Sequence, residues 1–98
     1  MIEDIKKIGI SDEFYNLLIE NLGYDIVLNL ACNYELVKKN INLLKSYGIE
    51  NIEELLLNRD SLFLKDSEEI FEKLNKQDIE TFVMLVNSDY TNIDSLFL

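Results

Sequence analysis

Not one proline interrupts the 98 residues of this chain, and only three glycines do. Proline and glycine are the residues that most often end helices, because proline lacks a backbone donor and glycine adopts left-handed conformations easily. A chain this poor in both can form helices almost throughout. Because no two segments read as partner strands, the sequence predicts an all-α fold, a compact array of short helices in one domain over residues 1–98.

The stretch from Asn33 to Leu64 shows the helical pattern most clearly. Gly48 supplies the left-handed residue that ends many helices, and the apolar residues before it recur at helical spacing. We expect Asn33 to cap the first helix and Asn51 to open a second, short one. The stretch therefore reads as two helices joined by a tight corner. The two apolar faces are Val37, Ile41 and Leu44 in the first helix and Ile52, Leu55 and Leu56 in the second.

Signals for helix starts and stops also mark the flanking segments. A short opening helix is expected to end at Gly9, and Ser11 has the side chain of a good N-cap for the helix that follows. Further along, Asp66 is predicted to cap a helix through its carboxylate. The inward face of that helix is predicted to consist of Ile70, Phe71 and Leu74.

Two apolar segments are less easily assigned. The run 26–31 is rich enough in β-branched residues for a strand, but without a partner strand we interpret it as a short buried helix. The segment 79–86 is apolar on almost every side, which predicts the most buried helix of the fold. Cys32 follows the first of these segments, and we expect it to be a buried structural thiol.

The chain also contains traces of an internal repeat of about 40 residues. Residues 5–10 match residues 44–49 at an offset of 39, and Asn51-Ile52 matches Asn92-Ile93 at an offset of 41. The pentapeptide at 60–64 recurs at 94–98, but at an offset of 34, so the two registers conflict. A degenerate helical repeat and chance similarity among leucine-rich helices both stay open.

The central stretch resembles the repeat of mitochondrial transcription termination factors. The resemblance implies stacked helix pairs and an association with nucleic acid. The family usually has a proline where this chain has Asp60, and its nucleic-acid groove is basic. The chain also resembles small bacterial proteins of Firmicutes type, a resemblance that implies no activity. The first resemblance is carried by Leu44, Tyr47, Gly48, Ile49, Ile52, Leu55, Leu56, Leu62 and Leu64.

Charge and composition narrow the classes of partner and of functional site that this chain can have. Nineteen acidic residues against nine basic ones give a formal net charge of −10, which repels phosphate and anionic membranes and favours a basic partner. Histidine is absent and there is a single cysteine, so a zinc site built from Cys and His is excluded and no catalytic constellation is recognisable. We therefore predict a non-enzymatic protein without a cofactor or bound metal.

These observations lead to a hypothesis of a small acidic helical module that binds a protein partner or has a structural role. The alternative is a nucleic-acid-associated protein related to termination-factor repeats. We expect a cytoplasmic protein outside any membrane, because a single cysteine fits a reducing compartment and no segment has the length of a membrane span. The possible partner surface consists of Lys38, Lys39, Lys45, Leu96, Phe97 and Leu98.

The apolar C-terminal segment allows two outcomes. Residues 93–98 either fold back onto the helix around Phe82 and Val86, which predicts a monomer, or expose an apolar patch that pairs with another chain. We favour folding back, because burial within one chain costs no translational freedom.

Overall fold

Every regular element in residues 1–97, the part of the chain that this computed structural model describes, is helical. The prediction of an all-α fold is confirmed. Leu98 lies outside the described residues. Along the chain the elements are the 3-10 helix η1 (Ile2–Ile8), α1 (Asp12–Leu22), α2 (Tyr24–Cys32), α3 (Tyr34–Ser46), α4 (Ile52–Asn58), the 3-10 helix η2 (Asp60–Leu64), α5 (Ser67–Asn75), α6 (Ile79–Ser88) and the 3-10 helix η3 (Tyr90–Phe97).

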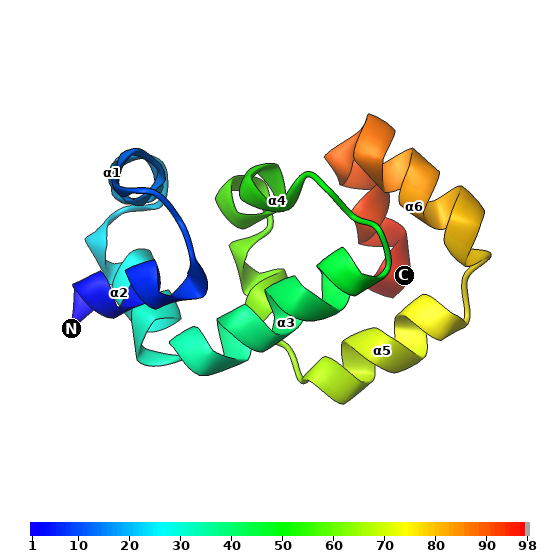
Figure 1. Cartoon of the computed structure of the whole chain (residues 1–98), viewed down its shortest axis with the longest axis horizontal. Helices are drawn as coiled ribbons and strands as arrows, with labels where there is room; N and C mark the ends of the chain where they lie inside the picture. Colours follow the sequence, from blue (N-terminus) through cyan, green and yellow to red (C-terminus); the bar gives the residue numbers. More distant parts are fainter. Residues whose placement is uncertain (98) are drawn as a thin grey trace.

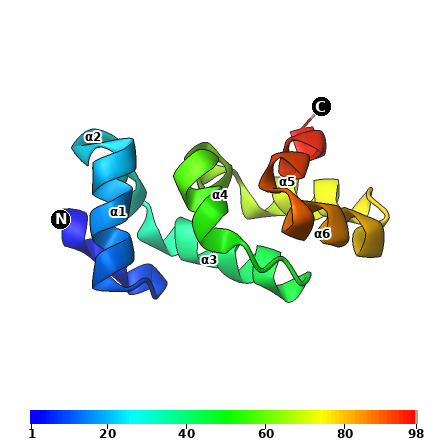
Figure 2. The same ribbon diagram turned by 90° about the horizontal axis from the view of Figure 1, so that it is seen from above.

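The elements follow one another along the long axis of the molecule (Figures 1 and 2). η1, α1 and α2 pack together at one end, α3 and α4 occupy the middle, and α5, α6 and η3 form the other end. The molecule measures 38 × 25 × 22 Å and has a radius of gyration of 13.1 Å, close to the ~13 Å expected for a compact domain of about 100 residues.

The helix ends are fixed by local signals that the sequence mostly predicted. The Ser11 hydroxyl accepts a hydrogen bond from the backbone N–H of Phe14 at 3.1 Å, and the Asp66 carboxylate accepts one from Glu68 at 3.1 Å, so both predicted caps are confirmed. Gly48 has a φ of 98°, the left-handed conformation expected after α3. Asn33 occupies the N-cap position of α3 as predicted, but the expected side-chain hydrogen bond is absent, because its amide instead donates to the carbonyl of Asn29 in α2.

The core runs through all the elements, and its largest fully buried side chain is Phe63 of η2. Three predictions of burial are wrong. Phe71 of α5 is 49% exposed, Cys32 is exposed, and α6 is not the most buried helix, because Met84 and Leu85 are 60% and 44% exposed. The run 26–31 does lie in a helix, α2, but Ile26 is 42% exposed.

One buried polar side chain, Asn40 of α3, links three elements. Its amide donates to the carbonyl oxygens of Phe63 at 2.9 Å and Lys65 at 2.8 Å, and its own carbonyl accepts from the Ser67 hydroxyl at 2.6 Å. Asn40 is fully buried and Ser67 is 6% exposed. The backbone between η2 and α5 is thereby fixed to the middle of α3.

A second set of side chains ties the corner between α3 and α4 to the end of α6. The Asn87 amide donates to the Gly48 carbonyl at 3.0 Å, and its oxygen accepts from the Glu50 backbone at 2.8 Å. In return, the Asn51 amide donates to the Val86 carbonyl at 2.8 Å. These bonds place the beginning of α4 against the last turn of α6.

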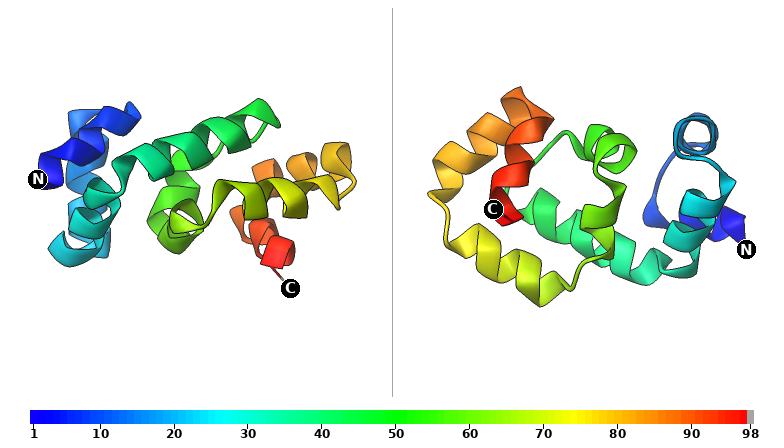
Figure 3. Two further views of the ribbon diagram at one scale, coloured as in Figure 1. Left: turned by 90° about the horizontal axis from the view of Figure 1, so that it is seen from below. Right: turned by 180° about the vertical axis from the view of Figure 1, so that it is seen from behind.

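Residues 93–97 fold back onto their own chain, as predicted for the segment 93–98, whose last residue lies outside the described residues. η3 packs against α6 and α5, and the view from behind shows it inside the angle between these helices (Figure 3). Ile93 and Leu96 are 3% and 2% exposed, and Phe97 is half-buried. Leu96 is therefore a core residue and is not part of an exposed partner surface.

The structure does not establish the repeat. At the offset of 41, Asn51-Ile52 at the start of α4 falls on Asn92-Ile93 inside η3, so the matched residues lie in different kinds of element. The two copies of the pentapeptide do correspond in structure, since residues 60–64 form η2 and residues 94–97 lie in η3. Two stretches also share the order helix, helix, 3-10 helix, one from α3 to η2 and one from α5 to η3.

Candidate functional site

The three lysines of the predicted partner surface are all exposed on α3. Lys38 and Lys45 are seven residues apart, which places them on the same side of a helix, and Lys39 lies beside them. Lys45 also lines a groove together with Glu50, Glu53 and Glu54. Its positive charge is therefore set among carboxylates, and the stripe does not continue into a basic surface at that end.

We call this hollow the α3–α4 groove. Its volume is 360 Å³, within the range of ~300–1,000 Å³ that is usual for ligand sites. Three parts of the chain form it: the corner between η1 and α1, the second half of α3, and the segment that enters and begins α4. Aliphatic side chains line its apolar part, namely Ile8, Ile10, Ile41, Ile52 and Leu56.

The polar part of the α3–α4 groove is mainly acidic. Glu50, Glu53 and Glu54 supply three exposed carboxylates, whereas Lys45 supplies one ammonium group. The side-chain oxygen of Asn51 is buried and has no hydrogen-bond partner among residues 1–97, although its amide is bonded to Val86. The groove thus combines aliphatic walls and negative charge, an arrangement that suits a cationic group on an apolar stem.

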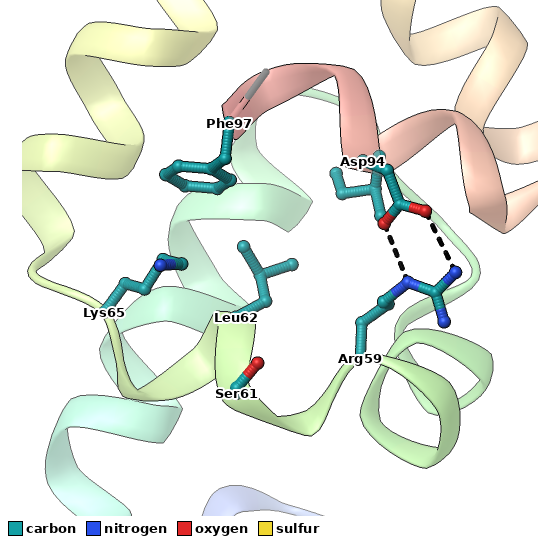
Figure 4. Close-up of a pocket in the computed structure, with 7 residues that line it drawn as sticks. Arg59, Ser61, Leu62, Lys65, Asp94 and Phe97 are labelled. Atoms are coloured by element: carbon teal, nitrogen blue, oxygen red, sulfur yellow. Dashed lines mark hydrogen bonds and ion pairs between the residues drawn. The ribbon is translucent and has the colours of Figure 1, made fainter.

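The second hollow, which we call the η2–η3 pocket, lies between the 3-10 helices η2 and η3 and has a volume of 170 Å³ (Figure 4). Leu62, Ile93 and Phe97 provide its apolar walls. Figure 4 shows Lys65 and Phe97 on one side of the pocket and the pair of Arg59 and Asp94 on the other. The Lys65 ammonium lies 4.6 Å from the centre of the Phe97 ring.

The Arg59–Asp94 pair joins the end of α4 to η3 by a two-pronged ion pair. Arg59 Nε donates to Asp94 Oδ1 at 2.7 Å, and Nη2 donates to Oδ2 at 2.9 Å. The guanidinium also lies 5.3 Å from the centre of the Tyr90 ring. The hydrogen bonds from Arg59 hold the pKa of Asp94 below its ordinary value of 3.8, and they raise the pKa of Arg59.

Replacement of Asp94 by asparagine is expected to remove stability that depends on pH. Because folding lowers the pKa of Asp94, the ionised carboxylate favours the folded state above the ordinary pKa of 3.8, and this contribution is lost as the pH falls below that value. The melting temperature of the wild type should exceed that of Asp94→Asn at pH 7. The difference between the two melting temperatures should shrink as the pH falls into the acid range in which Asp94 becomes protonated.

Thermal unfolding followed by circular dichroism between pH 7 and pH 2 checks this expectation. Asp60→Asn is the control for the loss of one negative charge, because Asp60 is in none of the salt bridges formed by residues 1–97. A difference between the wild type and Asp94→Asn that stays constant across this range would contradict a role for the ionised carboxylate.

Most residues of both hollows were not predicted from the sequence. Glu53 and Glu54 are exposed, and nothing in the sequence indicates that the Gly9 corner lies beside them. One signal was available in the sequence, namely the acidic side chains that flank Asn51. No cluster of three or more acidic or cysteine side chains able to hold a metal ion occurs within residues 1–97.

Comparisons of the chain with protein families, with curated proteins and with solved structures found no match. The resemblance to termination-factor repeats therefore stays a prediction. Within residues 1–97, no helix has both the length and the apolar character needed to span a membrane.

Proposed function

We propose that the protein is a non-enzymatic helical module that binds a basic, amphipathic segment of a partner protein in the α3–α4 groove. The observation that carries this proposal is the groove itself, in which three exposed carboxylates border aliphatic side chains from three parts of the chain. As part of the same proposal, the module acts as a monomer in the cytoplasm.

The aliphatic and acidic side chains of the groove together favour one kind of residue in the partner segment. A lysine or arginine side chain has an aliphatic stem and a charged end, so it can cover apolar surface while its charge stays near carboxylates and water. In the α3–α4 groove the stem would lie along Ile10 and Ile41, and the charged end would reach Glu53 and Glu54. The volume of 360 Å³ holds one or two such side chains and not a folded domain.

The net charge of the chain supports the same class of partner. A charge of −10 increases the rate at which a basic segment meets the protein, and it repels nucleic acid. At physiological ionic strength this attraction is screened beyond about 8 Å. The local carboxylates, and not the overall charge, therefore decide where the segment binds.

The test uses a fluorescent peptide of about 14 leucine and lysine residues, with the leucines at helical spacing. Fluorescence anisotropy at about 150 mM salt should show saturable binding. Glu53→Gln/Glu54→Gln should weaken it about fivefold, since two exposed ion pairs contribute about 1 kcal/mol together. Oligolysine, which lacks apolar side chains, should bind more weakly than the amphipathic peptide.

The matched control is Glu68→Gln/Glu69→Gln. These glutamates occupy the first turn of α5 just as Glu53 and Glu54 occupy the first turn of α4, so both double variants lose the same charge from the same helical position. The control should change the affinity less than twofold. Equal weakening by the two double variants would show attraction to net charge alone and would contradict a binding site in the groove, as would the absence of binding.

A further inference from the structure

The η2–η3 pocket has the opposite electrostatic character to the α3–α4 groove. Arg59 and Lys65 supply two positive charges at its rim, whereas Asp94 supplies one negative charge. A local excess of positive charge is unusual in a chain with a net charge of −10. Distant carboxylates are screened beyond about 8 Å at physiological ionic strength, so the charges at the rim govern an ion bound there.

The two cations at the rim are not equivalent. Arg59 is engaged on two atoms by Asp94, and a third nitrogen, Nη1, donates to the carbonyl of Asn58 at 2.7 Å. Lys65 takes part in none of the salt bridges formed by residues 1–97, and its ammonium group lies over the face of Phe97. Lys65 is thus the positive charge that remains able to pair with a ligand.

The walls of the η2–η3 pocket determine the size and polarity of the rest of the ligand. Leu62 and Ile93 are 5% and 3% exposed, and with Phe97 they form an apolar interior next to the Lys65 ammonium. The volume of 170 Å³ is close to that of an engineered apolar cavity of about 150 Å³ that binds benzene. The Ser61 hydroxyl, also at the rim, makes no hydrogen bond among residues 1–97 and offers a second donor.

We propose that the η2–η3 pocket binds a small monocarboxylic acid with one aromatic ring or a short branched chain. The apolar part of the acid fills the space bounded by Leu62, Ile93 and Phe97. Its carboxylate pairs with Lys65 and accepts a hydrogen bond from Ser61. This site is separate from the α3–α4 groove, so the proposal does not depend on the binding of a peptide there.

The test titrates benzoate into isotopically labelled full-length protein and follows backbone amide signals by NMR. The expected dissociation constant is about 1 mM, because so small a ligand has few atoms with which to gain free energy. Saturable shifts should centre on Ile93 and Phe97 in η3. Benzamide has the same ring without the charge and should bind at least threefold more weakly.

Lys65→Gln should weaken the binding of benzoate about threefold to tenfold, in line with the loss of one partly exposed ion pair. Lys76→Gln is the matched control, since it removes the same charge from an exposed lysine at the end of α5, and it should change the affinity less than twofold. Raising the salt concentration should weaken the binding of benzoate to the wild type and leave that of benzamide unchanged. This change in salt concentration tests the contribution of charge to benzoate binding without any substitution in the protein.

Three results would overturn the proposal. Shifts that centre outside the η2–η3 pocket, or that do not saturate, would show that the pocket does not bind the acid. Equal affinity for benzoate and benzamide would show that the carboxylate does not contribute to binding. Equal affinity of the wild type and Lys65→Gln for benzoate would show that Lys65 does not pair with the carboxylate.

Discussion

Asn40→Ala is expected to lower the free energy of unfolding by about 3 kcal/mol, which for a chain of this size lowers the melting temperature by roughly 15 °C. The substitution leaves the carbonyl oxygens of Phe63 and Lys65 and the hydroxyl of Ser67 without their hydrogen-bond partner. Each buried polar group left in this state costs about 1–3 kcal/mol, and residual access of water to the Lys65 carbonyl keeps the total near the lower end. Chemical denaturation and thermal unfolding both measure the effect.

Asn42→Ala is the matched control, because it makes the same chemical change two residues along the same helix. Asn42 is exposed, and its side chain forms no hydrogen bond among residues 1–97. Its loss should change the free energy of unfolding by no more than about 0.5 kcal/mol. If the two variants were equally stable, Asn40 would not be the link between α3 and the chain after η2.

Phe63→Ala is expected to lower the free energy of unfolding by about 3–5 kcal/mol. This is a large part of the ~5–15 kcal/mol that stabilises a typical domain. Phe63 is the largest fully buried side chain of the described residues, so alanine leaves a cavity that the surrounding helices cannot fill. Phe71→Ala makes the same change at a side chain that is 49% exposed, and it should cost about 1 kcal/mol or less.

This pair of phenylalanines distinguishes the structure from the sequence-based expectation, which placed Phe71 on an inward face. Urea denaturation gives the free energy of unfolding, and a similar slope for both variants would show that each still unfolds from a comparably compact state. A loss for Phe71→Ala as large as that for Phe63→Ala would mean that Phe71 lies in the core and that the orientation of α5 is wrong.

The fold class and most helix ends were predictable because they depend on local physics. Ser11 and Asp66 bond to backbone groups two or three residues away, and Gly48 only has to adopt a positive φ. Asn40 was also detectable, since it lies three residues after Val37 and four before Leu44, on the apolar face of α3. A polar residue in that position predicts either a buried hydrogen bond or a destabilised helix, and the sequence analysis did not single it out.

The orientation of α5 and α6 was not predictable from periodicity. Ile70 and Phe71 are neighbours about 100° apart around the helix, and either direction could face a core. The bonds from Asn40 fix where α5 begins, and only the resulting contact with α3 selects Ile70. α6 is apolar on almost every side, so its sequence does not show that Met84 and Leu85 stay exposed.

The same reason explains why neither hollow was predicted. The α3–α4 groove needs the Gly9 corner to lie beside Glu53 and Glu54, more than 40 residues further along the chain. The two segments lie close together because α1 packs on α4, and no local sequence pattern predicts this contact. The sequence did supply the chemical types of the residues, which is why it predicted a basic partner before the groove was located.

The ion pair between Arg59 and Asp94 also bears on the order in which the chain assembles during synthesis. The two residues are 35 positions apart, so the pair cannot form until a long loop has closed, whereas contacts within each neighbouring group of helices close sooner. A ribosome delivers the N-terminal helices first, at about 5–20 residues per second. For a few seconds, the growing chain therefore presents α4 and η2 before η3 has been made, and chaperones that recognise exposed apolar side chains have their opportunity in that interval, before η3 emerges and docks.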